Sequence, residues 1–173
     1  MKKTVIVPTD FSIESLHVVK TILSMTSREE KFDIIFLHGV HLTTSITELL
    51  FFSHSEMIRK LSNPHFDEAC HVIKNKFSSQ INSIRKDIFT GFTQAAFENY
   101  LEKNQVDKAF ISSTYDLQMS RKNSFDLIPF IKRSNLMVDQ VDLRIETRVS
   151  EKGKLAVIFA NTISTSLTQT ESI

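Results

Sequence analysis

The sequence predicts an α/β protein whose core is an open, mostly parallel five-stranded sheet with helices on both faces. Two observations support this fold class. Short apolar segments, such as residues 4–7 (TVIV) and 32–40 (FDIIFLHGV), alternate along the chain with segments of helical periodicity. Uninterrupted apolar strands are typical of sheets that are buried on both faces. The alternation of strands and helices implies right-handed crossovers between parallel strands.

The composition indicates one compact domain and excludes several function classes. The chain has 173 residues, of which 41% are hydrophobic, and a formal net charge of +1. Without a strong positive field, we expect no nucleic-acid partner. The single Cys70 excludes an internal disulfide framework and fits a reducing compartment. No apolar segment has the length of a membrane span or a leader, so we expect a cytoplasmic protein without a membrane partner.

The first half of the chain contains two predicted strands and three predicted helices. The strands are residues 4–7 and 32–40, and the helices are residues 13–25, 53–61 and 66–80. Ser12 can cap the first of these helices, in a partial capping-box pattern with Ser15. Pro64 is expected to interrupt the chain before the last one.

One short apolar stretch in this half, residues 49–52 (LLFF), belongs to none of these elements. It could be buried beneath the crossover to the third strand, or it could be a contact surface for a partner. The sequence favours burial in the core.

The second half contains three predicted strands and two predicted helices. The strands are residues 83–89, 107–112 and 137–145, and the helices are residues 94–104 and 127–132. Thr93 can cap the first of these helices after a turn at Gly91. Pro129 is compatible only with the first turn of the second helix.

We predict one α/β domain over residues 2–145 and a C-terminal extension over residues 146–173. Residues 144–149 and 155–160 could form a hairpin, which would give the protein a C-terminal β extension. The second of these segments could extend the sheet or pair across a dimer. The end of the extension, residues 161–173, is rich in Ser and Thr and has the composition of a tail.

Four segments follow predicted strands and are expected to lie at one edge of the sheet. Ligands of such sheets bind beyond the carboxyl ends of the strands, where the strand order reverses. The segments placed there are residues 8–10, 39–41, 90–92 and 112–114. Any binding site is therefore predicted among them.

Several of these segments resemble the universal stress protein family. The resemblance is carried by VIVPTDFS before a helix, by IIFLHGV, by a glycine after the third strand and by VDKAFIS after the next helix. It covers residues 2–143 and implies a Rossmann-like sheet of the universal-stress-protein type that dimerises through its last strand. In one branch of that family an adenine nucleotide binds near positions equivalent to Asp10 and Val40. Its phosphates lie on a loop with the pattern Gly-x-x-Gly, nine residues, Gly-Ser/Thr.

The corresponding loop of this chain has no glycine. It reads SSTYDLQMSRKNS over residues 112–124, with Ser113 and Asp116 in place of two glycines and Asn123–Ser124 in place of Gly-Ser. Glycines matter in such loops because they let backbone N–H groups reach phosphate oxygens. Asp116 would add a negative charge beside an anionic ligand. The sequence thus predicts no bound cofactor.

The alternative is ATP or AMP bound at a degenerate site. That site would consist of Asp10, Val40, Ser113, Asn123 and Ser124, with Arg121 and Lys122 supplying the positive charge that the missing glycines do not. Asp10 has two possible roles: it could contact a ligand, or it could accept hydrogen bonds from backbone N–H groups in the strand-to-helix loop. The glycine-free loop favours the structural role.

No catalytic or metal-binding constellation is visible. His38 and His41 have an odd spacing and point to opposite faces of a regular strand, so they are not expected to share a metal. Cys70 lies on the apolar face of a predicted helix and is expected to be an inert thiol. Ser112, Ser113 and Thr114 are not part of a nucleophile elbow. We therefore expect a non-catalytic stress-response or signalling module that acts through protein contacts, as a homodimer with an unknown protein partner.

Overall fold

The computed structural model describes residues 2–42, 44–114, 116–119 and 122–143, and these residues form a six-stranded sheet. The main path of the sheet is β3-β2-β1-β4-β6, and all its neighbouring strands are parallel. These strands are β1 (Lys2–Pro8), β2 (Lys31–Val40), β3 (Ile81–Phe89), β4 (Lys108–Ser112) and β6 (Met137–Val141). The predicted fold class is confirmed for this part of the chain. The suggested hairpin, the domain boundary at residue 145 and the tail lie outside the described residues.

A sixth strand was not predicted. β5 (Ser124–Phe125) has two residues and pairs antiparallel with the end of β2, off the main path of the sheet. So short a strand has no periodicity of its own, which is why the sequence pattern did not reveal it.

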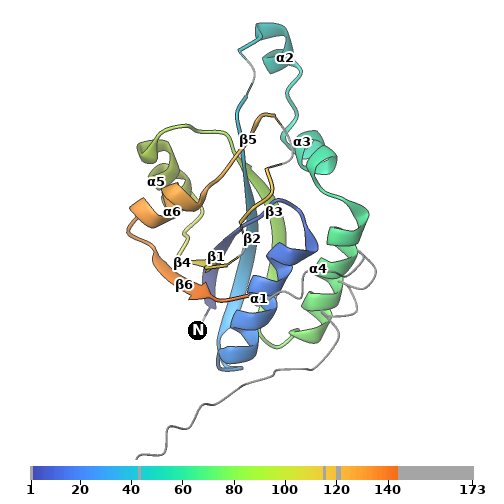
Figure 1. Cartoon of the computed structure of the whole chain (residues 1–173), viewed down its shortest axis with the longest axis vertical. Helices are drawn as coiled ribbons and strands as arrows, with labels where there is room; N and C mark the ends of the chain where they lie inside the picture. Colours follow the sequence, from blue (N-terminus) through green and yellow to red (C-terminus); the bar gives the residue numbers. More distant parts are fainter. Residues whose placement is uncertain (1, 43, 115, 120–121, 144–173) are drawn as a thin grey trace, which may run out of the picture.

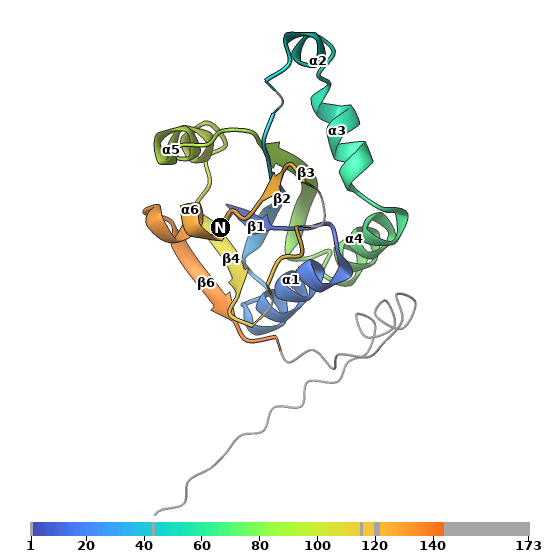
Figure 2. The ribbon, with the colours of Figure 1, turned by 45° about the horizontal axis from the view of Figure 1, so that its top comes forward.

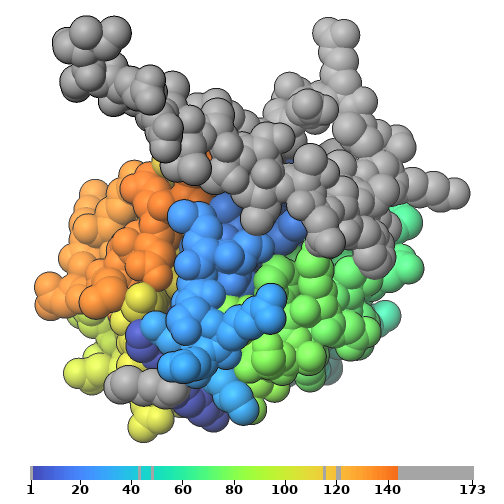
Figure 3. Space-filling model, turned by 90° about the horizontal axis from the view of Figure 1, so that it is seen from below, coloured from blue at the N-terminus to red at the C-terminus, as the bar shows by residue number. Residues whose placement is uncertain are grey.

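Helices cover both faces of the sheet (Figures 1 and 2). Those between β1 and β3 are α1 (Ile13–Met25), α2 (Ile46–Leu50), α3 (His54–Leu61) and α4 (Pro64–Lys76), and those after β3 are α5 (Gln94–Lys103) and α6 (Ile128–Arg133). α1 and α4 pack on one face, and α5 and α6 pack on the other. Seen from below, the surface of α1 lies between that of the segment ending in β6 and that of α4 (Figure 3).

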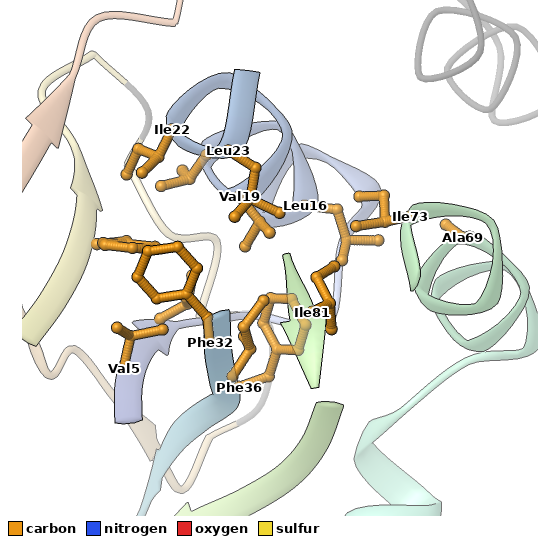
Figure 4. Close-up of a cluster of buried hydrophobic side chains, with 14 of the residues drawn as sticks. Val5, Leu16, Val19, Ile22, Leu23, Phe32, Phe36, Ala69, Ile73 and Ile81 are labelled. Carbon is orange, nitrogen blue, oxygen red and sulfur yellow. The ribbon is translucent and has the colours of Figure 1, made fainter. Parts of the chain in front are cut away.

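Two hydrophobic cores result, one on each face. Successive residues of β1 point to opposite sides, so Val5 and Val7 belong to one core and Ile6 belongs to the other. In the first core, side chains of α1 and α4 converge on aromatic and aliphatic residues of the strands (Figure 4). Burial of both faces explains why the strands read as continuous apolar runs.

The helix that contains Cys70 differs from the prediction at both ends. It begins at Pro64, whose missing N–H is not needed in a first turn, and the side chain of Asn63 caps it by accepting the N–H of Phe66 at 2.8 Å. The predicted break between the two helices is present at residues 62–63, but the second helix begins at Pro64 rather than at residue 66. The helix also ends at Lys76 rather than 80. Gln80 instead lies in a turn, where its side-chain amide donates to the carbonyl of Leu23 at 3.0 Å.

The other predicted elements are close to the observed ones. α1 has the predicted bounds, and Thr93 caps α5 by accepting the N–H of Ala96 at 3.1 Å. β4 begins at Lys108, one residue later than predicted, and the carboxylate of Asp107 accepts the N–H of Thr4 at 2.7 Å. The last strand, β6, ends at Val141, earlier than the predicted residue 145.

The apolar stretch at residues 49–52 is not in the core, so the prediction of burial was wrong. Leu50 is 77% exposed and Phe51 is 82% exposed. The physical reason is their position, because α2 has only five residues and lies at the far end of a projection beyond the sheet (Figure 1).

Among the residues that the structure describes, no helix has both the length and the apolar character that crossing a membrane requires.

Candidate functional site

The strand order reverses between β1 and β4, so the candidate site lies at the carboxyl ends of these strands and of β2. β2 and β3 follow β1 on one side, whereas β4 and β6 lie on the other. Ligands of open parallel sheets bind at this reversal. Asp10, at the end of β1, and Ser113, at the end of β4, flank it.

Asp10 is bonded to the backbone of two different loops. One carboxylate oxygen, Oδ1, accepts the N–H of Ser12 at 3.0 Å, and the other, Oδ2, accepts the N–H of Gln118 at 2.9 Å. The first bond is the local contact expected for the structural role of Asp10. The second ties the loop after β1 to the loop after β4, across the point where the strand order reverses. Both oxygens are therefore engaged by the chain itself.

The end of β2 is covered by β5. In this antiparallel pair Gly39 faces Phe125 and Val40 faces Ser124, and the N–H of His41 donates to the carbonyl of Asn123 at 2.7 Å. The structure thus brings Val40, Asn123 and Ser124 together, as the alternative with a degenerate site requires. It does so by direct pairing of the backbones, which leaves no gap for a base between them.

His38 ties β5 to the centre of the sheet and was missed by the sequence reasoning. Its side chain is buried, with Nδ1 2.6 Å from the carbonyl oxygen of Thr9 and Nε2 2.8 Å from Oγ of Ser124. A carbonyl can only accept, so Nδ1 carries a proton and donates to Thr9, while Nε2 and the hydroxyl of Ser124 share the second hydrogen bond. A polar residue inside the apolar run IIFLHGV is the signal that could have revealed this role.

Phe125 fills the space above the end of β2. Its ring stacks on His41 with 4.4 Å between ring centroids, and it also packs against Phe89 and Phe130. A Cβ atom on Gly39 would lie 2.5 Å from the carbonyl oxygen of Phe125 and 2.9 Å from its ring. Gly39 is therefore required for the close approach of β5.

The described residues line a small cavity at the reversal point. The cavity there has a volume of about 10 Å³, and Pro8, Phe110, Leu117 and Ile128 contribute to its lining. That space corresponds to about one water molecule. Pockets for small-molecule ligands are typically roughly 300–1,000 Å³. This cavity is therefore too small for a nucleotide.

Ser113 bonds to β6. Its N–H donates to the carbonyl of Val141 at 2.8 Å and its hydroxyl donates to the same oxygen at 3.2 Å, while the hydroxyl of Thr114 donates to the carbonyl of Leu143 at 2.9 Å. Ser113, which was predicted to lie in a phosphate-binding loop, therefore bonds to β6. It does not lie with Val40, Asn123 and Ser124 at β5. Phe92 does not fill the crevice, since it is 78% exposed. Tyr115 and Arg121 lie outside the described residues.

A second polar cluster surrounds Asp87 on β3. Its carboxylate lies 2.9 Å from both His54 Nε2 and Arg85, and it accepts the hydroxyl of Tyr100 at 2.7 Å and the N–H of Ile88 at 2.8 Å. Burial, together with the nearby carboxylate, raises the pKa of Tyr100 above its usual range. Four donors satisfy the carboxylate, and the cluster fastens α3 and α5 to the strand at the edge of the sheet.

Comparison with solved structures identifies the fold. Universal stress protein UspA from Lactobacillus plantarum aligns with 80% of this chain and 97% of its own, at 12% identity and a TM-score of 0.51. A universal stress protein family member from Burkholderia pseudomallei aligns with 82% of this chain and 96% of its own, at 8% identity and a TM-score of 0.50. No protein-family model matches the chain, and no curated protein does. The chain therefore has the universal-stress-protein fold.

Proposed function

We propose that this protein is a non-catalytic stress-response or signalling module with a universal-stress-protein fold, which acts through protein contacts and binds no nucleotide at its crevice. One observation carries the proposal: β5 occupies the end of β2, where the family resemblance would place an adenine base. Phe125 and Ser124 thus occupy the position where an adenine base would otherwise pack and form hydrogen bonds.

The energetics of opening the crevice support the proposal. A base could reach the backbone of Val40 only if β5 left, which would break its pairing and the bond between Ser124 and His38. Each net hydrogen bond contributes about 1 kcal/mol. Removing the half-buried Phe125 ring from its contacts costs roughly 1–2 kcal/mol. The sum of about 3–5 kcal/mol would weaken nucleotide binding by roughly two to four orders of magnitude.

The hydrogen bonding in the crevice also supports a non-catalytic role. Both carboxylate oxygens of Asp10 accept backbone N–H groups, and both ring nitrogens of His38 bond to Thr9 and Ser124. A general base needs a free lone pair within reach of a substrate proton. The carboxylate of Asp10 and the ring of His38 instead hold loops and strands together.

Calorimetric titration with ATP and AMP tests the proposal. The wild-type protein is expected to give no binding signal up to millimolar nucleotide. Micromolar binding that Asp10→Ala abolishes would overturn the proposal in favour of ATP or AMP at the degenerate site. Asp142→Ala is the matched control, because this exposed carboxylate lies beyond the end of β6 and outside the candidate site.

We also propose a homodimer through the outer edge of β6, as the family resemblance implies. Among the described residues, β6 is the outermost strand on its side of the sheet, and its first residue, Met137, is 61% exposed. Sedimentation of the wild type and of Met137→Asp tests this interface. At low protein concentration a dimer that the substitution converts to monomer is expected, and an unchanged mass at that concentration would contradict it.

A further inference from the structure

Exposed apolar side chains gather on α2 and the residue after it. Ile46 is 76% exposed, Leu49 42%, Leu50 77% and Phe51 82%. Among the described residues, four of the seven large hydrophobic side chains that are exposed thus lie within six consecutive positions. Single exposed hydrophobic residues are ordinary, whereas contiguous ones mark a contact surface. We call residues 46–61, which comprise α2 and α3, the arm (Figures 1 and 2).

A hollow of about 190 Å³ adjoins these side chains. Its apolar lining comes from Leu42, Phe51, Phe52 and Met57, and its polar lining includes Glu56. A cavity of about 150 Å³ is large enough to accept a benzene molecule. The hollow can therefore receive one large apolar side chain such as a leucine or a phenylalanine.

The projecting side chains and the hollow are complementary, and one segment carries both. A two-fold symmetric interface requires this property, because each copy presents the same patch to the other. We propose that the arm binds the arm of a second copy of this chain, with Leu50 of each copy seated in the hollow of the other. This goes beyond the proposed function and is separate from the interface at β6.

The available area fits such an interface. An aromatic side chain can bury roughly 150–250 Å², and an aliphatic one somewhat less. Ile46, Leu49, Leu50 and Phe51 together therefore offer roughly 500 Å² at their observed exposures. Two copies together would bury about 1,000 Å², which is close to the lower limit for a specific interface. The contact is thus expected to be weak and concentration-dependent.

The charges around the hollow are compatible with self-association. Glu56 lies 3.0 Å from Arg59 and 3.9 Å from Lys60, so the carboxylate offsets part of the positive charge of its two cationic neighbours on α3. An arm with charges of one sign would repel its own copy. This arm presents both signs, so two copies can approach without a large electrostatic penalty.

Sedimentation velocity over a range of micromolar concentrations tests the proposal. Leu50→Asp/Phe51→Asp is expected to halve the mass of the assembly at high concentration. The matched control is Phe92→Asp, since Phe92 is equally exposed but lies on another loop. In a Met137→Asp background, where the edge of β6 is disabled, the arm substitutions should convert a remaining dimer to monomer. An arm variant that leaves the mass unchanged in both backgrounds would overturn the proposal, as would a wild type that is monomeric throughout.

A covalent trap provides an independent readout that does not depend on how the charged variants fold. Leu50→Cys mixed with Met57→Cys, both in a Cys70→Ala background, should form a covalent dimer under mild oxidation, because Leu50 of one copy would enter the hollow that Met57 of the other copy lines. Phe92→Cys mixed with Met57→Cys in the same background should not. Equal trapping in both mixtures would indicate random collision and count against the arm. These outcomes do not depend on nucleotide binding, so failure of the arm and failure of the proposed function can be told apart.

Discussion

The hydroxyl of Ser124 lies 2.8 Å from Nε2 of His38, although the two residues are 86 positions apart in the chain. This bond connects β5 to a strand in the interior of the sheet. The other ring nitrogen of His38 bonds to Thr9 at the end of β1. One buried imidazole thus links three segments at the edge of the sheet where a ligand would bind.

Ser124→Ala is expected to destabilise the protein by about 1–3 kcal/mol, because it removes the hydrogen bond between β5 and the buried ring of His38. The change in the midpoint of urea unfolding measures this loss. Asn123→Ala is the control, since Asn123 contributes its backbone carbonyl to the bond with His41. Equal losses in the two variants would show that the hydroxyl of Ser124 has no special role.

Asp10→Ala is expected to loosen the loop after β4, because the N–H of Gln118 loses its acceptor. Amide hydrogen exchange should become faster at Gln118 and at Ser12, with a loss of roughly 1–2 kcal/mol in stability. Asp10→Asn retains one side-chain oxygen and should restore protection at only one of the two amides. Unchanged exchange at Gln118 in the alanine variant would contradict the link between the loops.

Gly39→Ala is expected to displace β5 and to cost about 1–3 kcal/mol, since the new methyl group would overlap the Phe125 carbonyl. The exchange rate of the His41 amide, which bonds to Asn123, reports the displacement. Adding Phe125→Ala should not restore stability, because the nearest atom belongs to the backbone. Recovery in that double variant would instead identify the ring as the obstacle.

Cys70 is expected to be unreactive in the folded protein. Burial, with the nearby Asp67, raises the pKa of its thiol from 9.0 to about 12. At pH 8 the thiolate fraction is thus about a thousandfold lower than in the unfolded chain, and alkylation should be slower accordingly.

The same shift makes stability depend on alkaline pH. The folded state keeps the thiol proton while the unfolded state loses it, so this contribution to stability is intact below pH 9 and declines between pH 9 and about 12. Cys70→Ala should have a flatter stability profile over that range. Rapid alkylation of the native protein at pH 8 would refute the raised pKa.

The sequence predicts the layers of this protein better than its crevice. The helical spacing of Leu16, Val19 and Leu23 determines the bounds of α1, and the apolar strands reveal a sheet that is buried on both faces. These features depend on local periodicity. β5 depends instead on pairing with β2, which is far away in the sequence. A strand of two residues is too short to show a hydrophobic period, so the sequence pattern cannot reveal it.

The position of LLFF could not be predicted for a related reason. Four consecutive apolar residues indicate that a surface will be covered, but not whether the same chain or another copy covers it. Pro64 shows a different ambiguity, because proline both ends helices and begins them. The side chain of Asn63, which precedes it, decides between the two by capping the helix.

The antiparallel pairing of β5 with β2 has a consequence for the order in which the elements of the sheet fold. Closing a loop between residues 38 and 124 has a large entropic cost, and that loop contains β3, α5 and β4. The pairing can become favourable only after these elements have docked and have shortened the effective distance. We expect β5 to join the sheet last, so the crevice is open in the newly folding chain and closes as the final step of folding.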